Sequence, residues 1–72
     1  MEKLHATKIL FGKRVKFLRL QAGLSQEALA HKCGLDRTYI SGIERGLRNP
    51  TLEVIAILAE GLEIEIKNII EF

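Results

Sequence analysis

The feature that most constrains the fold of this chain is a pair of short helical patterns joined by one tight turn. The first pattern opens at Ser25, a residue type that caps helix N-termini, and closes near Gly34. The second opens at Asp36 and closes at Gly46. Two short helices across a turn of three or four residues cross at a steep angle, so the second can project from the surface.

Helical patterns also precede and follow this pair. The first runs from about Ala6 to Gln21, and its core stripe has helical spacing: Phe11, Val15, Leu18 and Ala22. After Pro50, Thr51 is expected to cap a fourth helix that extends to about Leu62. This helix is expected to direct inward Leu52, Ile55, Ala59 and Leu62, with Leu58 beside them. Gly61 is expected to weaken its last turn by up to about 1 kcal/mol.

The C-terminal segment fits two patterns. Residues 63–66 alternate like a strand, whereas Ile66, Ile69 and Ile70 fit one helical turn. Because no other segment offers a partner strand, we expect a short helix from about Glu65. The chain is therefore predicted to be all-α, with five helices in one domain spanning residues 1–72. Residues 1–8 are expected to form an N-terminal extension, and residues 63–72 a dimerisation tail.

Charge is unevenly distributed along the 72 residues. Residues 1–48 contain ten Lys or Arg and four Asp or Glu, a net charge of +6. Residues 49–72 contain one Lys and five Glu, a net charge of −4. A basic part joined to an acidic part indicates one region that faces a polyanion and another that faces protein or solvent.

Several functional classes are disfavoured by the composition. Apolar runs are too short for a membrane span or a secretory signal, and the single cysteine cannot form an intramolecular disulfide, so we expect a cytoplasmic protein. His31 and Cys33 have no second ligand pair at zinc spacing. The sequence offers neither a nucleophile with a base nor a pair of carboxylates for catalysis, so we do not expect an enzyme. We expect no metal, cofactor or small-molecule ligand.

Three stretches carry a resemblance to a known family: LSQEALAHKCGL, DRTYISGIERG and NPTLEVIAILAEGL. They resemble the helix-turn-helix domains of phage repressors and Cro, the xenobiotic response element family, over about Phe11 to Leu62. Within that family, DRTYISGIER and the following RN look most similar to controller proteins of restriction-modification systems. The resemblance implies a compact lambda-repressor-like domain that binds double-stranded DNA as a homodimer on a palindromic operator and regulates transcription.

The resemblance also implies which residues contact DNA. Base contacts are implied for Arg37, Thr38 and Ser41, and an arginine at a helix start can present two donors to guanine. Backbone or flanking contacts are implied for Ser25, Gln26, Tyr39, Arg45, Arg48 and Asn49. Tyr39 could instead pack beside Leu35. Gly42 offers no side chain for readout.

Two further implications are structural. Arg19 and Glu44 match a buried ion pair that ties the first helix to the end of the third. The usual two-fold arrangement of the family favours dimerisation through apolar residues of the tail, with a monomeric core cap as the alternative. The predicted interface consists of Ile64, Ile66, Ile69, Ile70 and Phe72.

Phe17 and Leu20 fall outside the core stripe of the first helix. They either pack against the tail or form an exposed patch for a partner, and the sequence leaves both open. An alternative function rests on these residues and the isoleucine tail: a protein-interaction module, such as an antitoxin or a partner that sequesters another regulator.

Overall fold

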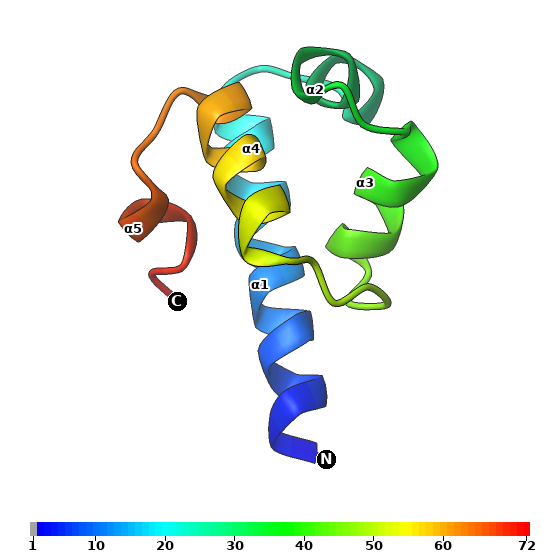
Figure 1. The fold of residues 1–72 in the computed structure, drawn as a ribbon, viewed down its shortest axis with the longest axis vertical. Helices are drawn as coiled ribbons and strands as arrows, with labels where there is room; N and C mark the ends of the chain where they lie inside the picture. The colour runs from blue at the N-terminus through cyan, green and yellow to red at the C-terminus, as the bar shows by residue number, and fades with distance from the viewer. Residues whose placement is uncertain (1) are drawn as a thin grey trace.

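The computed structural model describes residues 2–72 as five α-helices joined by short loops (Figure 1). In chain order the helices are α1 (Glu2–Gln21), α2 (Gln26–Cys33), α3 (Arg37–Glu44), α4 (Leu52–Leu62) and α5 (Ile66–Ile69). Residues 2–72 contain no strand, which confirms the all-α prediction. In Figure 1, α5 and α3 lie on opposite sides of the pair formed by α1 and α4.

The helices α2, α3 and α4 begin at the capping residues that the sequence predicts. Each capping oxygen accepts a hydrogen bond from a backbone N–H in the following turn: Ser25 from Ala28 at 3.0 Å, Asp36 from Thr38 at 3.0 Å and Thr51 from Val54 at 3.2 Å. Gly34 ends α2 with a φ of 67°, a left-handed conformation that glycine adopts without steric cost. Local capping chemistry therefore sets these boundaries.

The first helix is longer than predicted. It begins at Glu2 rather than near Ala6, and its N-terminal turns extend beyond the rest of the protein (Figure 1, blue). The Thr7 hydroxyl donates to the backbone carbonyl of Lys3 at 2.9 Å. The predicted N-terminal extension therefore continues α1, apart from Met1, which lies outside the described residues.

All five helices contribute to one core. Its buried apolar residues are Phe11 and Val15 of α1, Leu29 and Ala30 of α2, Ile40 and Ile43 of α3, Leu58, Ala59 and Leu62 of α4, and Ile69 of α5. Two positions differ from the prediction, because Ala22 is exposed just after α1 and Leu52 is 76% exposed. Leu52 is the first residue of α4, a turn before the helix reaches the core.

Gly61 has a packing role that helix propensity does not reveal. It is buried where α4 meets α2, and a Cβ at this position would overlap the Sγ of Cys33. The Cys33 thiol donates to the carbonyl of Ile57 at 3.6 Å, which holds the sulfur in this position. The glycine therefore permits close contact between the two helices.

The tail forms a short helix, as predicted, and it is attached to α1. Ile69 is fully buried, and the Arg14 Nε donates to the carbonyl of Asn68 at 3.0 Å. The Phe72 ring meets the Phe11 ring edge-to-face, with centroids 6.4 Å apart. No helix among residues 2–72 has the length and apolarity needed to cross a membrane.

Candidate nucleic-acid interface

The third helix presents one side to the core and the other to solvent. Ile40 and Ile43 are completely or almost completely buried, whereas Arg37 and Thr38 are exposed and Ser41 is half-buried. A short turn connects α2 to α3, in which the N–H of Leu35 donates to the carbonyl of Ala30 at 2.9 Å. Figure 1 shows α3 at the edge of the molecule, steeply inclined to α2. The helix is thus held by its apolar face while its first turn remains accessible.

Arg19 and Glu44 form the ion pair that the resemblance implies. The Arg19 Nε lies 2.6 Å from Glu44 Oε2, and its Nη2 donates to Oε1 at 3.0 Å. The side chains are 8% and 3% exposed, and Arg19 Nη1 also donates to the carbonyl of Leu24 at 2.8 Å. Because both charges are buried and paired, this contact fixes the end of α3 to α1.

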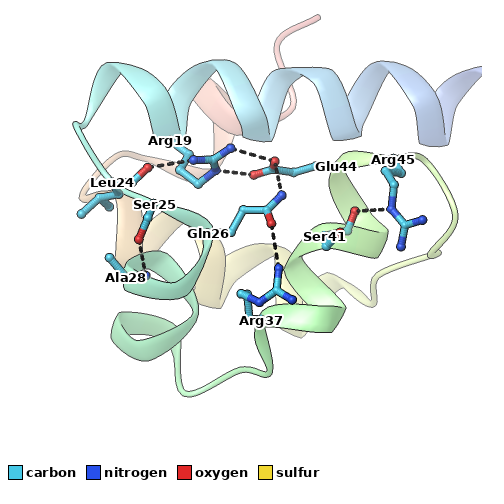
Figure 2. Close-up of polar contacts among 9 residues, drawn as sticks. All are labelled: Arg19, Leu24, Ser25, Gln26, Ala28, Arg37, Ser41, Glu44 and Arg45. Atoms are coloured by element: carbon cyan, nitrogen blue, oxygen red, sulfur yellow. Dashed lines mark hydrogen bonds and ion pairs between the residues drawn. The ribbon is translucent and has the colours of Figure 1, made fainter.

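The ion pair continues through Gln26 to the exposed start of α3 (Figure 2). The Gln26 Nε2 donates to Glu44 Oε1 at 3.0 Å, and the Gln26 Oε1 accepts from Arg37 Nη1 at 3.4 Å. The bond from Nε2 to the carboxylate requires the amide oxygen to point toward Arg37. Gln26 therefore links a rigid, buried carboxylate to the guanidinium of the arginine that the resemblance assigns to base contact.

Arg48 lies against α3 from the following loop. Its guanidinium carbon is 5.5 Å from the centroid of the Tyr39 ring, and its side chain passes over Gly42, which has no Cβ to block it. Tyr39 is half-buried and packs against the core, as Leu35 also does. A guanidinium is thereby added beside the middle of α3.

The remaining predicted contacts lie on or near the same face. Arg45 is exposed at the end of α3, and its Nε donates to the carbonyl of Ser41 at 3.3 Å (Figure 2). Ser25 is exposed and engaged in its cap, and Asn49 is exposed after Arg48. The segment from Asp36 to Asn49 thus presents three exposed guanidinium groups and one exposed carboxylate. This balance favours contact with an anionic surface.

The sequence did not specify the partners in two of these relationships. The resemblance implies that Gln26 contacts phosphate and braces the third helix, and the structure shows the partner of this brace, Glu44, eighteen residues away. The sequence indicates only that Gly42 has no side chain to contact a base, whereas the structure shows that it leaves the space that Arg48 occupies. An isolated glycine within a helical pattern is the one sign that could have indicated such a packing role.

His31 is exposed on α2, and Cys33 is half-buried at the end of this helix. Residues 2–72 contain no cluster of three or more His, Cys, Asp and Glu side chains able to hold an ion. Burial raises the pKa of the Cys33 thiol, an effect that the charge of Lys32 opposes and that of Glu60 reinforces. The thiol is therefore a packing group.

The predicted dimer residues occupy different environments. Ile66, Ile70 and Phe72 are exposed, and Ile64 is half-buried against the core. Ile69 is completely buried within the protomer, so its placement in the interface was wrong: it anchors the tail. Ile70 and Phe72 also border an apolar groove with residues of α1, α4 and the α3–α4 loop: Leu4, Thr7, Lys8, Phe11, Asn49, Pro50 and Ile55.

These features define a small helix-turn-helix protein, and the chain belongs to the helix-turn-helix family, whose family model matches residues 15–68. Control protein C.BamHI of Bacillus amyloliquefaciens is 44% identical over 66 residues, covering 90% of this chain and 82% of that protein.

Solved structures give the same picture. The restriction-modification controller protein C.AhdI from Aeromonas hydrophila is 48% identical, with a TM-score of 0.87, covering 89% of this chain and 97% of that one. The controller protein C.Esp1396I, as a tetramer in complex with its natural 35 base-pair operator, is 41% identical, with a TM-score of 0.79. The match covers 88% of this chain and 93% of that one. The lambda-repressor-like fold expected from the resemblance is therefore confirmed.

Proposed function

We propose that this chain is a sequence-specific DNA-binding transcriptional regulator that acts as a homodimer. The observation that carries the proposal is the connected series Arg19, Glu44, Gln26 and Arg37, which runs from a buried ion pair to an exposed guanidinium at the start of α3. A helix fixed at its end and accessible at its first turn suits insertion into the major groove.

The residues divide by their place on α3. Arg37, Thr38 and Ser41 contact base edges, and Arg37 presents two donors to guanine O6 and N7. Contacts to the DNA backbone or to flanking bases come from Ser25, Gln26, Tyr39, Arg45, Arg48 and Asn49. Ser25 and Gln26 stand at the N-terminus of α2, where free N–H groups attract a phosphate. Gln26 thus both holds Arg37 and approaches the DNA backbone.

The relatives support a more particular assignment. Similarity to C.BamHI and C.AhdI over most of each chain favours a controller protein of a restriction-modification system. The C.Esp1396I operator complex supports binding to double-stranded DNA as an oligomer. We therefore propose a cytoplasmic, non-catalytic regulator that binds a palindromic or pseudo-palindromic operator.

The dimer is proposed to form through the exposed tail residues Ile66, Ile70 and Phe72, next to the apolar groove. The acidic charge of residues 49–72 would keep this surface away from DNA. A two-fold axis would place the two copies of α3 in successive major grooves, about 34 Å apart.

Selection of bound sequences from a random duplex pool, at a fixed salt concentration, tests this function. We expect a palindrome to be enriched. Arg37→Ala should cost about 1 to 3 kcal/mol of binding free energy and relax base preference at one position per half-site. Arg48→Ala serves as the comparison, since it should weaken binding to all sequences. Unchanged operator preference in Arg37→Ala would refute the assignment.

A further inference from the structure

The helix α1 carries a second apolar stripe in addition to the one that faces the core. Its positions are separated alternately by four and three residues, the spacing of a coiled-coil seam. They are Ala6, Leu10, Lys13, Phe17 and Leu20. Leu10, Phe17 and Leu20 are 47%, 50% and 58% exposed. Of the two alternatives for Phe17 and Leu20, packing against the tail or exposure, their exposed fractions favour exposure.

The outer stripe lies on the side of α1 away from the core. Phe17 follows the fully buried Val15 by two positions, or about 200° of helical rotation. The tail covers a neighbouring flank, where Arg14 bonds to Asn68, and does not bury the stripe. Arg14 also lies over the Phe17 ring, with its guanidinium carbon 5.7 Å from the centroid. The stripe therefore consists of four apolar residues and the central Lys13, with the Arg14 guanidinium at its flank.

The charge of α1 indicates what could cover this stripe. The helix contains six Lys or Arg and one Glu. Among its side chains from Lys3 to Gln21, Arg19 is the one that forms an ion pair, with Glu44. Lys13 is at the centre of the outer stripe, and Lys16 is exposed beside it. A second copy of α1 packed antiparallel would place Lys13 opposite Lys13, with like charges along both flanks. Self-pairing is therefore opposed by repulsion, and an acidic helix would be attracted.

We propose that the outer stripe of α1 is a docking surface for an acidic amphipathic helix of a different protein. The partner would contribute apolar side chains at heptad spacing, packed between Leu10, Phe17 and Leu20, and carboxylates facing Lys13 and Lys16. The outer stripe belongs to α1, whereas the proposed DNA contacts come from α2, α3 and the segments flanking them, so docking uses none of the residues proposed to contact DNA.

A synthetic peptide tests the proposal with the full chain. The probe is a labelled helical peptide with leucines at its a and d positions and glutamates at the flanking positions. The control peptide carries glutamines in place of the glutamates. In fluorescence anisotropy we expect the glutamate peptide to bind about tenfold more tightly than the glutamine peptide. This difference should shrink between about 0.1 M and about 1 M salt, where the Debye length falls from about 10 Å to about 3 Å.

Variants locate the binding surface. Leu20→Ser and Lys13→Glu each change an exposed side chain, so the fold should persist, and each should weaken the glutamate peptide about tenfold or more. Leu4→Ser is the matched control, since Leu4 is exposed on the same helix but borders the apolar groove. Leu4→Ser should bind like the unmodified chain.

Three outcomes would overturn the proposal. Equal binding by Leu20→Ser, Lys13→Glu and the unmodified chain would place the peptide elsewhere. An assembly larger than a dimer in sedimentation of the protein alone, if it dissociates in Leu20→Ser, would show that the occupant is a second copy. Binding to anionic phosphatidylserine vesicles, lost in Leu20→Ser, with no binding to the peptide would assign the stripe to a lipid surface.

Discussion

The side chain of Arg48 occupies the space that a side chain at position 42 would require. A Cβ built on Gly42 would lie 2.9 Å from the Cγ and 3.1 Å from the Nε of Arg48, closer than such atoms normally approach. Because Gly42 is a glycine, Arg48 can cross α3 and place its guanidinium over the Tyr39 ring. A glycine in the middle of a helix here positions an arginine that comes from the next loop.

The substitution Gly42→Ala should separate DNA binding from stability. Alanine favours the helix by up to about 1 kcal/mol, so the free energy of unfolding should stay constant or rise. The new methyl group would displace Arg48 from Tyr39, and we expect operator affinity to fall about tenfold. Thermal unfolding and DNA titration measure the two effects. Arg48→Ala should show a comparable loss of affinity, and an unchanged affinity in Gly42→Ala would contradict the role given to Gly42.

The substitution Glu44→Gln should destabilise the protein severely. It leaves the Arg19 guanidinium buried without a counter-charge, at a cost of about 3 to 5 kcal/mol, measurable by urea denaturation. Gln26→Ala is the control, because it retains the ion pair and removes one polar link, at about 1 kcal/mol. Gln26→Ala should nevertheless reduce base discrimination, since Arg37 loses its side-chain partner. A larger destabilisation by Gln26→Ala than by Glu44→Gln would refute this ranking.

The substitution Glu63→Gly should stabilise the protein. Glu63 ends α4 with a φ of 59°, and the left-handed conformation costs a residue with a Cβ about 1 to 2 kcal/mol. Its ion pair with Lys32 spans 3.0 Å at the surface and is worth at most about 1 kcal/mol. We expect a net gain of about 1 kcal/mol in the free energy of unfolding. Lys32→Ala measures the ion pair alone, and a loss of stability in Glu63→Gly larger than in Lys32→Ala would argue against strain at this position.

The substitution Gly61→Ala should destabilise the protein although it increases helix propensity. The added methyl group meets the Sγ of Cys33, and overpacking of this kind costs about 1 to 3 kcal/mol. Cys33→Ala removes the sulfur, so the double variant should recover part of the loss. A double-mutant cycle by chemical denaturation measures this coupling. Additive effects would show that Gly61 and Cys33 do not constrain each other.

The predictions from sequence succeeded where the determining contacts are local. Ser25, Asp36 and Thr51 cap their helices through hydrogen bonds that span two or three residues. Such capping residue types can be recognised directly in a sequence. The predictions were wrong where contacts with distant segments determine burial or packing. Leu52 fits an apolar stripe but lies a turn before α4 reaches the core, and the role of Gly61 depends on a sulfur in α2.

The candidate site was predictable to a similar degree. The resemblance identified Arg37 and Thr38, and the structure places both on the exposed face of α3. The link between Gln26 and Glu44 joins two helices, so no local pattern could specify it. The prediction that Ile69 lies in the dimer interface with the other apolar tail residues is wrong, since Ile69 is fully buried, and isoleucine is equally suited to a core and to an interface. Whether an isoleucine of the tail is in the core or in the interface depends on which face of α5 it occupies.

The shared carboxylate of Glu44 has a consequence for how such proteins can diverge. Arg37 is joined to the network through a single exposed hydrogen bond, so its replacement requires no repacking of the interior, and under the proposed function it would change the operator. Glu44 accepts hydrogen bonds from both Arg19 and Gln26, so its replacement would destabilise the fold. The proposed base contact and the stabilising ion pair thus lie at opposite ends of one chain of contacts, an arrangement that would let recognition evolve on a fixed scaffold.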